Sequence, residues 1–115
     1  MRATARKLLT LLALSIGSGA CANEPDVLAE GRAIALNPTK GNCAACHWIE
    51  GAESPGDLGP PLVAIAERFP EKNALRRQLW DPMGVNPNSR MPPFGRHRIL
   101  TEQEIDRVVD YLYSL

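Results

Sequence analysis

The stretch Cys43-Ala44-Ala45-Cys46-His47 carries the most information about the fold of this chain. Its two thiols are separated by two residues, so both sulfur atoms can reach the same edge of one planar ring. The imidazole of His47 follows directly and can lie beneath the centre of that ring as a metal ligand. This spacing is typical of covalent haem attachment, in which each cysteine adds to one vinyl group. Because the motif is short, its weight depends on an export signal, a second axial ligand and a helical wrapper elsewhere in the chain.

The N-terminus has the pattern of a secretory signal. Three basic residues among the first seven precede the apolar run Leu8–Ile16. That run is too short to span a bilayer, which takes about 20 residues, but it suits the core of a signal peptide. Small residues in Ala20-Cys21-Ala22 suit cleavage by signal peptidase. We therefore expect residues 1–22 to be removed, the mature chain to begin at Asn23, and the protein to reside in the periplasm.

A lipoprotein is the alternative at this end. In that case Cys21 becomes a lipidated N-terminus, and without lipidation we expect no membrane attachment. Gly19-Ala20-Cys21 permits lipidation, but Ser18 stands where a leucine is expected. Removal of Cys21 would leave only Cys43 and Cys46 as thiols. In an oxidising compartment two thiols ordinarily form a disulfide, and haem attachment is one way to divert them.

Composition predicts one small domain, residues 23–115, with a thin core. The full chain has 13 basic and 13 acidic residues, and residues 1–22 contain three of the basic ones, so the mature chain carries a net charge of −3. Nothing in this balance suggests the concentrated basic face of nucleic-acid binders, so no nucleic-acid partner is expected. Only two each of Phe, Trp and Tyr occur. A domain this small with so few large side chains builds a meagre core, and a covalently held porphyrin would fill the deficit.

Helical periodicity without any alternating strand pattern predicts an all-α fold. The expected segments are 26–36, a short turn at 43–48, 62–69, 73–80 with Asn73 as its cap, and a last helix beginning after Thr101. Proline-rich stretches 55–61 and 82–93 are expected to be loops.

The last helix has the clearest sequence signature. Thr101-Glu102-Gln103-Glu104 is a capping box, in which Thr101 and Glu104 satisfy each other's backbone N–H groups. The apolar residues that follow recur at helical spacing on one face: Ile105, Val108, Val109 and Leu112.

A haem iron held by one histidine needs a second ligand or keeps an open site. Met91 is the preferred thioether donor, because two prolines follow it and hold the residues before them extended. Such a stiff strap can present one side chain to the iron. Met83 precedes a glycine in a loop that does little to fix its direction, and His97 lies between two arginines in what should be a solvated turn. Both remain alternatives, and Met91 could instead simply pack in the core.

Pro60 is a candidate second contact of His47. In Gly59-Pro60-Pro61-Leu62 a stiff turn could aim the Pro60 carbonyl at the free ring N–H of His47, which would fix the ring's tautomer and orientation. The alternative is a plain loop that leads into a helix.

These features together resemble the class I c-type cytochrome fold, in which the first and last helices cross at small and aromatic residues. Gly31 and Tyr111 are the candidates for that crossing. Three stretches are further similar to the monohaem SoxX cytochromes of bacterial sulfur oxidation: 41–47, 59–63 and 91–101. The last of these is the most specific, and the resemblance covers roughly residues 29–112.

The resemblance implies one covalent haem c, anchored by Cys43 and Cys46, with His47 and Met91 as axial ligands of the iron. It also implies a heterodimer with a SoxA-type haem subunit, which couples thiosulfate to a cysteine of the SoxYZ carrier and passes the electrons to a cytochrome acceptor. This chain would be the electron-transfer subunit and would contain no catalytic residue for sulfur chemistry. Without Cys21 it offers no cysteine for a disulfide to the partner, so noncovalent assembly is expected.

Two other functions stay open from the sequence. A free-standing periplasmic monohaem cytochrome that shuttles respiratory electrons would use the same ligands with a different partner surface. A zinc module or a thiol-redox domain would use Cys43, Cys46 and His47 without haem. Zinc usually takes four protein ligands in structural sites, and only His97 is an obvious fourth.

Overall fold

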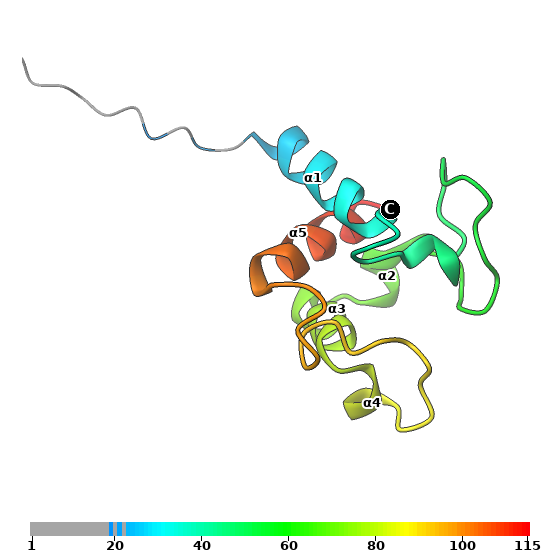
Figure 1. The fold of residues 1–115 in the computed structure, drawn as a ribbon. Helices are drawn as coiled ribbons and strands as arrows, with labels where there is room; N and C mark the ends of the chain where they lie inside the picture. The colour runs from blue at the N-terminus through cyan, green and yellow to red at the C-terminus, as the bar shows by residue number, and fades with distance from the viewer. Residues whose placement is uncertain (1–18, 20, 22) are drawn as a thin grey trace, which may run out of the picture.

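The computed structural model describes residues 19, 21 and 23–115. Within them the chain forms helices and no strand, as Figure 1 shows: α1 (Glu24–Leu36), the 3-10 turn η1 (Cys43–Ala45), α2 (Ile65–Arg68), α3 (Lys72–Trp80), α4 (Pro82–Val85) and α5 (Glu102–Tyr113). The all-α prediction is confirmed. The predicted signal peptide lies outside the described residues except for Gly19 and Cys21, so it stays a prediction. No helix in the described part of the chain has the length and apolar character to span a bilayer.

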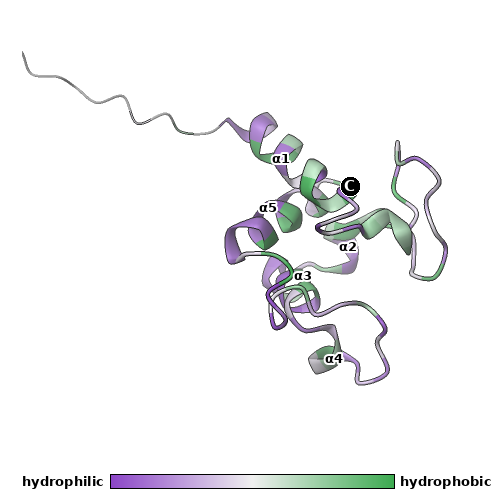
Figure 2. Ribbon diagram, in the orientation of Figure 1, coloured by the Kyte–Doolittle hydropathy of each residue, from purple (hydrophilic) through white to green (hydrophobic). Residues whose placement is uncertain are grey.

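The first and last helices cross at a glycine. A β-carbon on Gly31 would lie 2.8 Å from the carbonyl carbon of Arg107 and 2.8 Å from Cβ of Tyr111. Only glycine allows the two backbones to come this close, so the predicted crossing of Gly31 and Tyr111 is confirmed. Figure 2 shows hydrophilic residues at the start of α1 and hydrophobic ones nearer its end, where Ile34 and Ala35 are buried.

Helix α5 begins with the predicted capping box. The Glu104 amide donates to Oγ1 of Thr101 over 3.1 Å, and the Thr101 amide donates to Oε2 of Glu104 over 3.0 Å. Lys40, in the loop after α1, forms an ion pair with the same Glu104 side chain. The N-terminus of α5 is therefore both capped and tied to the segment that leads into η1.

The apolar core lies between α1, α3 and α5 and continues into the loops. Its largest fully buried side chains are Ile49, Ile65, Ile105, Val108 and Pro82. Ile49 comes from the loop after η1, and Phe94 and Leu100 from the chain before α5. The loops that carry the candidate site thus share one core with the helices.

Several elements differ from the predictions, beginning with α1, which starts at Glu24 instead of residue 26. Helix α2 begins at Ile65 instead of residue 62, because Ala64 has a left-handed backbone (φ 49°) and the Leu62 amide bonds to the carbonyl of Trp48. Helix α3 begins at Lys72, so Asn73 is not its cap. Residues 82–85 form the single helical turn α4, where a loop was predicted. Pro82 stands at its first position, where a backbone N–H has no partner within the helix, so the N–H that proline lacks is not missed.

Candidate functional site

The turn η1 gathers the two cysteines and the histidine. It follows Asn42, whose left-handed backbone (φ 48°) redirects the chain after α1. The Cys46 amide donates to the Cys43 carbonyl over 3.2 Å, and the His47 amide donates to the same oxygen over 3.0 Å. One carbonyl therefore closes the turn that carries all three functional side chains.

Both cysteines of this turn are free thiols and partly buried. Burial raises the pKa of the Cys43 thiol to about 11, and the neighbouring Cys46 adds to the increase. Cys43 is therefore a protonated, neutral thiol at neutral pH, and it packs against the apolar core. Two uncombined thiols on one turn are the arrangement that thioether attachment to one ring requires.

The loop from Trp48 to Leu62 is held against this turn by backbone hydrogen bonds. The Gly56 amide donates to the Ala44 carbonyl over 2.7 Å, and the Gly59 amide donates to the Cys46 carbonyl over 2.7 Å. The bond from Leu62 to Trp48 closes the loop at its base over 2.9 Å. These three bonds fix where Pro60 lies relative to the histidine.

The imidazole of His47 is oriented by two consecutive residues. Nδ1 of His47 lies 2.6 Å from the Pro60 carbonyl, so a proton on Nδ1 is donated to that oxygen. A β-carbon on Gly59 would lie 2.6 Å from the same Nδ1 and even closer to Cε1, so the ring rests against bare backbone. With Nδ1 occupied as a donor, Nε2 is left with the lone pair that binds a metal.

The segment of residues 91–96, called the strap below, contains Met91 and is anchored to the end of α3. Amides of residues 94–96 donate to the carbonyls of Leu79 and Trp80 over 3.1 to 3.2 Å. At a helix end these carbonyls have no intrahelical partner, so the strap satisfies them. Met91 itself is partly buried and packs against the same core as Cys43. Its sulfur lies 3.9 Å from Nε2 of Gln78 in α3.

The two alternative ligands occupy more exposed positions. Met83 lies on α4 with 38% of its surface exposed. His97 is exposed between Arg96 and Arg98, and Arg96 pairs with Asp81 over 3.2 Å. Met83 lies outside the strap that carries Met91, whereas the His97 amide donates to the Pro93 carbonyl of that strap over 3.0 Å.

The residues present suit a haem better than a bare metal ion. In the described part of the chain, no group of three or more His, Cys, Asp or Glu side chains is placed to hold a metal ion. The loop that carries Pro60 exposes large apolar side chains, including Leu58 at 86% and Trp48 at 45%. Two free thiols, an oriented imidazole, a thioether and exposed apolar surface together fit an apolar macrocycle with a central iron.

Sequence reasoning identified Cys43, Cys46, His47, Pro60 and Met91 but missed two neighbours. The sequence pointed to Gly59 only as part of the predicted turn Gly59-Pro60-Pro61-Leu62, and not as a contact of His47. Gln78 gave none, because a glutamine in a helix is usually a solvated side chain.

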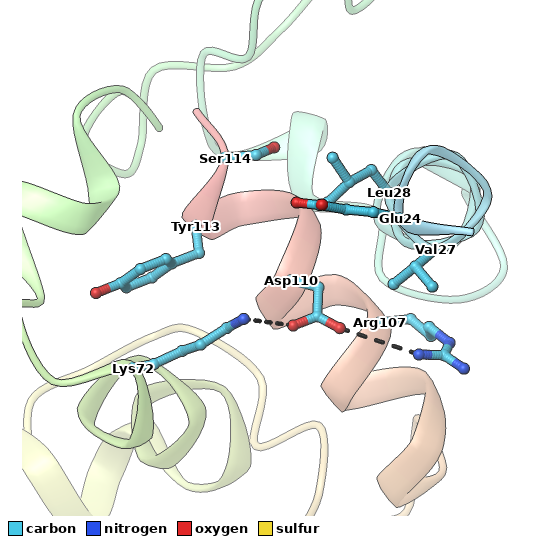
Figure 3. A pocket seen from close by; sticks show the side chains of 8 residues that line it. All are labelled: Glu24, Val27, Leu28, Lys72, Arg107, Asp110, Tyr113 and Ser114. Atoms are coloured by element: carbon cyan, nitrogen blue, oxygen red, sulfur yellow. Dashed lines mark hydrogen bonds and ion pairs between the residues drawn. The ribbon is translucent and has the colours of Figure 1, made fainter. Parts of the chain in front are cut away.

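A surface depression of about 440 Å³ lies elsewhere, between α1, the start of α3 and the end of α5 (Figure 3). Ion pairs cross it: Lys72 approaches Asp110 to 2.5 Å, and Arg107 approaches the same carboxylate to 4.0 Å. None of the cysteines, histidines or methionines lines it. Its charged residues Lys72, Asp110 and Arg107 pair with one another, and it includes none of the candidate haem ligands.

Comparisons with known proteins agree with the site chemistry. The family model for cytochrome c matches residues 28–115. Among solved structures, the crystal structure of SoxXA from P. pantotrophus is similar, with a TM-score of 0.69, 28% sequence identity, and coverage of 84% of this chain and 84% of that one.

Two curated relatives share sequence with the chain. An uncharacterized lipoprotein of Aquifex aeolicus (strain VF5) is 33% identical over 76 residues, which is 65% of this chain and 37% of the relative. The cbb3-type cytochrome c oxidase subunit CcoP of Azospirillum sp. (strain B510) is 36% identical over 84 residues, which is 64% of this chain and 27% of the relative. The chain thus spans about a third of the length of the curated relatives it matches.

Proposed function

The chain belongs to the cytochrome c family, and we propose that it is the electron-transfer subunit of a SoxAX-type complex in bacterial thiosulfate oxidation. The family carries covalently bound haem c, and Cys43 and Cys46 stand where its thioether bonds form. In the proposed reaction a carrier thiol of SoxYZ and thiosulfate form an S–S bond and release one proton and two electrons. A bound haem would supply a one-electron centre, so the two electrons would pass one at a time to a cytochrome acceptor.

The similarity to the SoxXA structure carries this proposal. It extends over 84% of both chains, so most of this chain takes part in it. The partner that follows from this similarity is a SoxA-type haem subunit. SoxYZ and the cytochrome acceptor would meet the assembled pair.

The roles of the residues follow from their positions. Cys43 and Cys46 would hold the haem through thioether bonds, and His47, whose ring Pro60 orients, would bind its iron. Met91, presented by the strap, would supply the second protein ligand of the iron. A bound haem with two protein ligands would supply one-electron transfer and no open site for a substrate. We therefore assign no catalytic residue to this chain.

The surface around the site suits a protein partner. Residues 48–61 contain three acidic side chains and no basic one, whereas residues 86–99 contain three arginines and no acidic one. The green loop after η1 and the yellow loop after α4 extend from the same side of the helical body in Figure 1. Oppositely charged loops next to exposed apolar side chains favour docking in one orientation.

Export completes the proposal. Removal of residues 1–22 would place the domain in the periplasm, where thiosulfate-oxidising complexes of this type would meet their substrate. The similarity to a protein named a lipoprotein keeps lipidation of Cys21 as the alternative outcome. Intact mass of the exported protein separates the two, because cleavage before Asn23 and acylation of Cys21 give different masses.

Purification from the periplasm of the native host tests the function. We expect a second haem protein to co-purify, and we expect the haem of this chain to be reduced by thiosulfate plus SoxYZ only when that protein is present. A chain that purifies alone and is not reduced under these conditions would contradict the proposal.

A free-standing or oxidase-linked electron shuttle is the second candidate. The similarity to CcoP, a subunit of a cytochrome c oxidase, favours it. Rapid electron exchange with respiratory cytochromes, together with no response to thiosulfate and the co-purified protein, would support this alternative.

A further inference from the structure

The side-chain amide of Gln78 lies next to the sulfur of Met91, with 3.9 Å between Nε2 and Sδ. In the described part of the chain this is the one hydrogen bond that the Gln78 side chain makes. We propose that Gln78 is a positioning residue for Met91: its N–H donates to the thioether sulfur and orients the other sulfur lone pair toward the haem iron. This inference rests on the proposed role of Met91 as an axial ligand.

Gln78 is well fixed for this task. It lies in the last part of α3, where Leu75 and Leu79 are buried and hold the helix against the core. The carbonyls of Leu79 and Trp80 bind the far end of the strap, so the donor and the strap are mounted on the same helix end. The position of the Gln78 side chain relative to the strap is therefore set by one helix end.

The backbone of the strap does not by itself fix the Met91 side chain. The Met91 amide donates to Oγ of Ser89 over 3.3 Å, and the next anchored amide is that of Phe94. Methionine has three flexible side-chain torsions, so its sulfur can point in several directions from this backbone. The contact with Gln78 selects one of them.

A donor on the sulfur also changes its electronic character. A thioether sulfur has two lone pairs, and when one binds iron the other can accept a hydrogen bond. The donor withdraws electron density from the sulfur, which weakens its donation to ferric iron more than to ferrous iron. Gln78 should therefore raise the reduction potential as well as hold Met91 in place.

The size of the effect is modest, because the contact is long and both groups are neutral. Net contributions of neutral hydrogen bonds correspond to about a two- to tenfold change in an equilibrium constant, and a long contact belongs at the lower end. We expect the equilibrium between bound and released Met91 to shift about threefold toward release when the donor is lost.

Two substitutions test the proposal on the exported haem-bound protein. Gln78→Leu removes the donor at similar volume, and Gln78→Glu keeps the shape but places a carboxylate oxygen beside the sulfur. Gln103→Leu, at an exposed position of α5, is the matched control. The measurements are the reduction potential, the sulfur-to-iron charge-transfer absorption of the ferric protein, the pH at which Met91 is displaced, and the melting temperature.

We expect both Gln78 variants to have a lower potential, a weaker or shifted charge-transfer band, and displacement of Met91 at lower pH, with Gln103→Leu unchanged. A Gln78→Leu protein with a normal band, potential and displacement pH would overturn the proposal, whether or not its melting temperature falls. Persistence of the band in Met91→Ala would overturn it through the ligand assignment. None of these measurements involves thiosulfate or a partner, so their failure would leave the proposed electron-transfer role standing.

Discussion

Gly95 lies directly against the indole of Trp80: a β-carbon on residue 95 would stand 2.7 Å from Cζ3 of that ring and closer still to Cε3. The Gly95 amide also donates to the Trp80 carbonyl over 3.2 Å. The strap that carries Met91 can therefore meet the end of α3 only where residue 95 has no side chain. This contact ties the position of the proposed sixth ligand to the packing of a buried glycine.

Gly95→Ala should displace the strap, because the rigid indole cannot move by the required distance. Overpacking of this kind costs about 2 kcal/mol of unfolding free energy, and we expect the charge-transfer band of Met91 to weaken in parallel. Denaturant unfolding and the ferric absorption spectrum measure the two effects. Gln103→Ala, at an exposed position of α5, is the control. Equal behaviour of the two variants would show that the Trp80 contact does not hold the strap.

Met91→Ala should abolish the sulfur-to-iron charge-transfer absorption and lower the reduction potential, because a thioether ligand stabilises ferrous iron. Met83→Ala should leave both unchanged, since Met83 is exposed on α4 and lies off the strap. Absorption spectroscopy and redox titration of the two variants decide between them. The reverse result would move the ligand assignment to Met83.

Cys46→Ser and Cys43→Ser should each reduce covalent haem, because each removes one of the two sulfurs that would form its thioether bonds. Haem staining after denaturing electrophoresis and intact mass measure the loss. Chain that carries no haem should be largely unfolded, since its core contains few large side chains. A cooperative melt of the haem-free chain at the temperature of the haem-bound protein would contradict this expectation.

Sequence patterns predicted those structural features that depend on residues close together in the chain. The capping box at Thr101 and Glu104 fixed the start of α5, because both of its hydrogen bonds span only three residues. The contact of His47 with Pro60 lies between residues 13 apart, yet two prolines made that turn recognisable.

What the sequence could not predict depends on contacts between distant segments. The start of α2 was misplaced because the left-handed backbone at Ala64 and a bond from Leu62 to Trp48 keep the preceding residues out of the helix. The contact between Gln78 and Met91 was missed because a helix residue meets a loop that returns to it after α4. The signal peptide and the role of Met91 stay predictions that chemistry must test.

The ion pair of Lys40 with Glu104 should make stability depend on pH in a defined direction. The hydrogen bond from Lys40, followed by that from the Thr101 amide, lowers the pKa of Glu104 below its ordinary value of 4.5. A carboxylate with a lowered pKa in the folded protein stabilises it above the ordinary pKa, and this stabilisation is lost as the pH falls through the folded pKa. Glu104→Gln keeps a capping side chain but removes the charge, so it should cost about 0.5 kcal/mol at pH 7. Thermal unfolding of both proteins from pH 7 to pH 3 should show this difference closing below about pH 4.5, whereas Thr101→Ala, which removes the cap, should stay about 1 kcal/mol less stable throughout. A gap between wild type and Glu104→Gln that is the same at pH 3 and pH 7 would show that the ion pair contributes nothing.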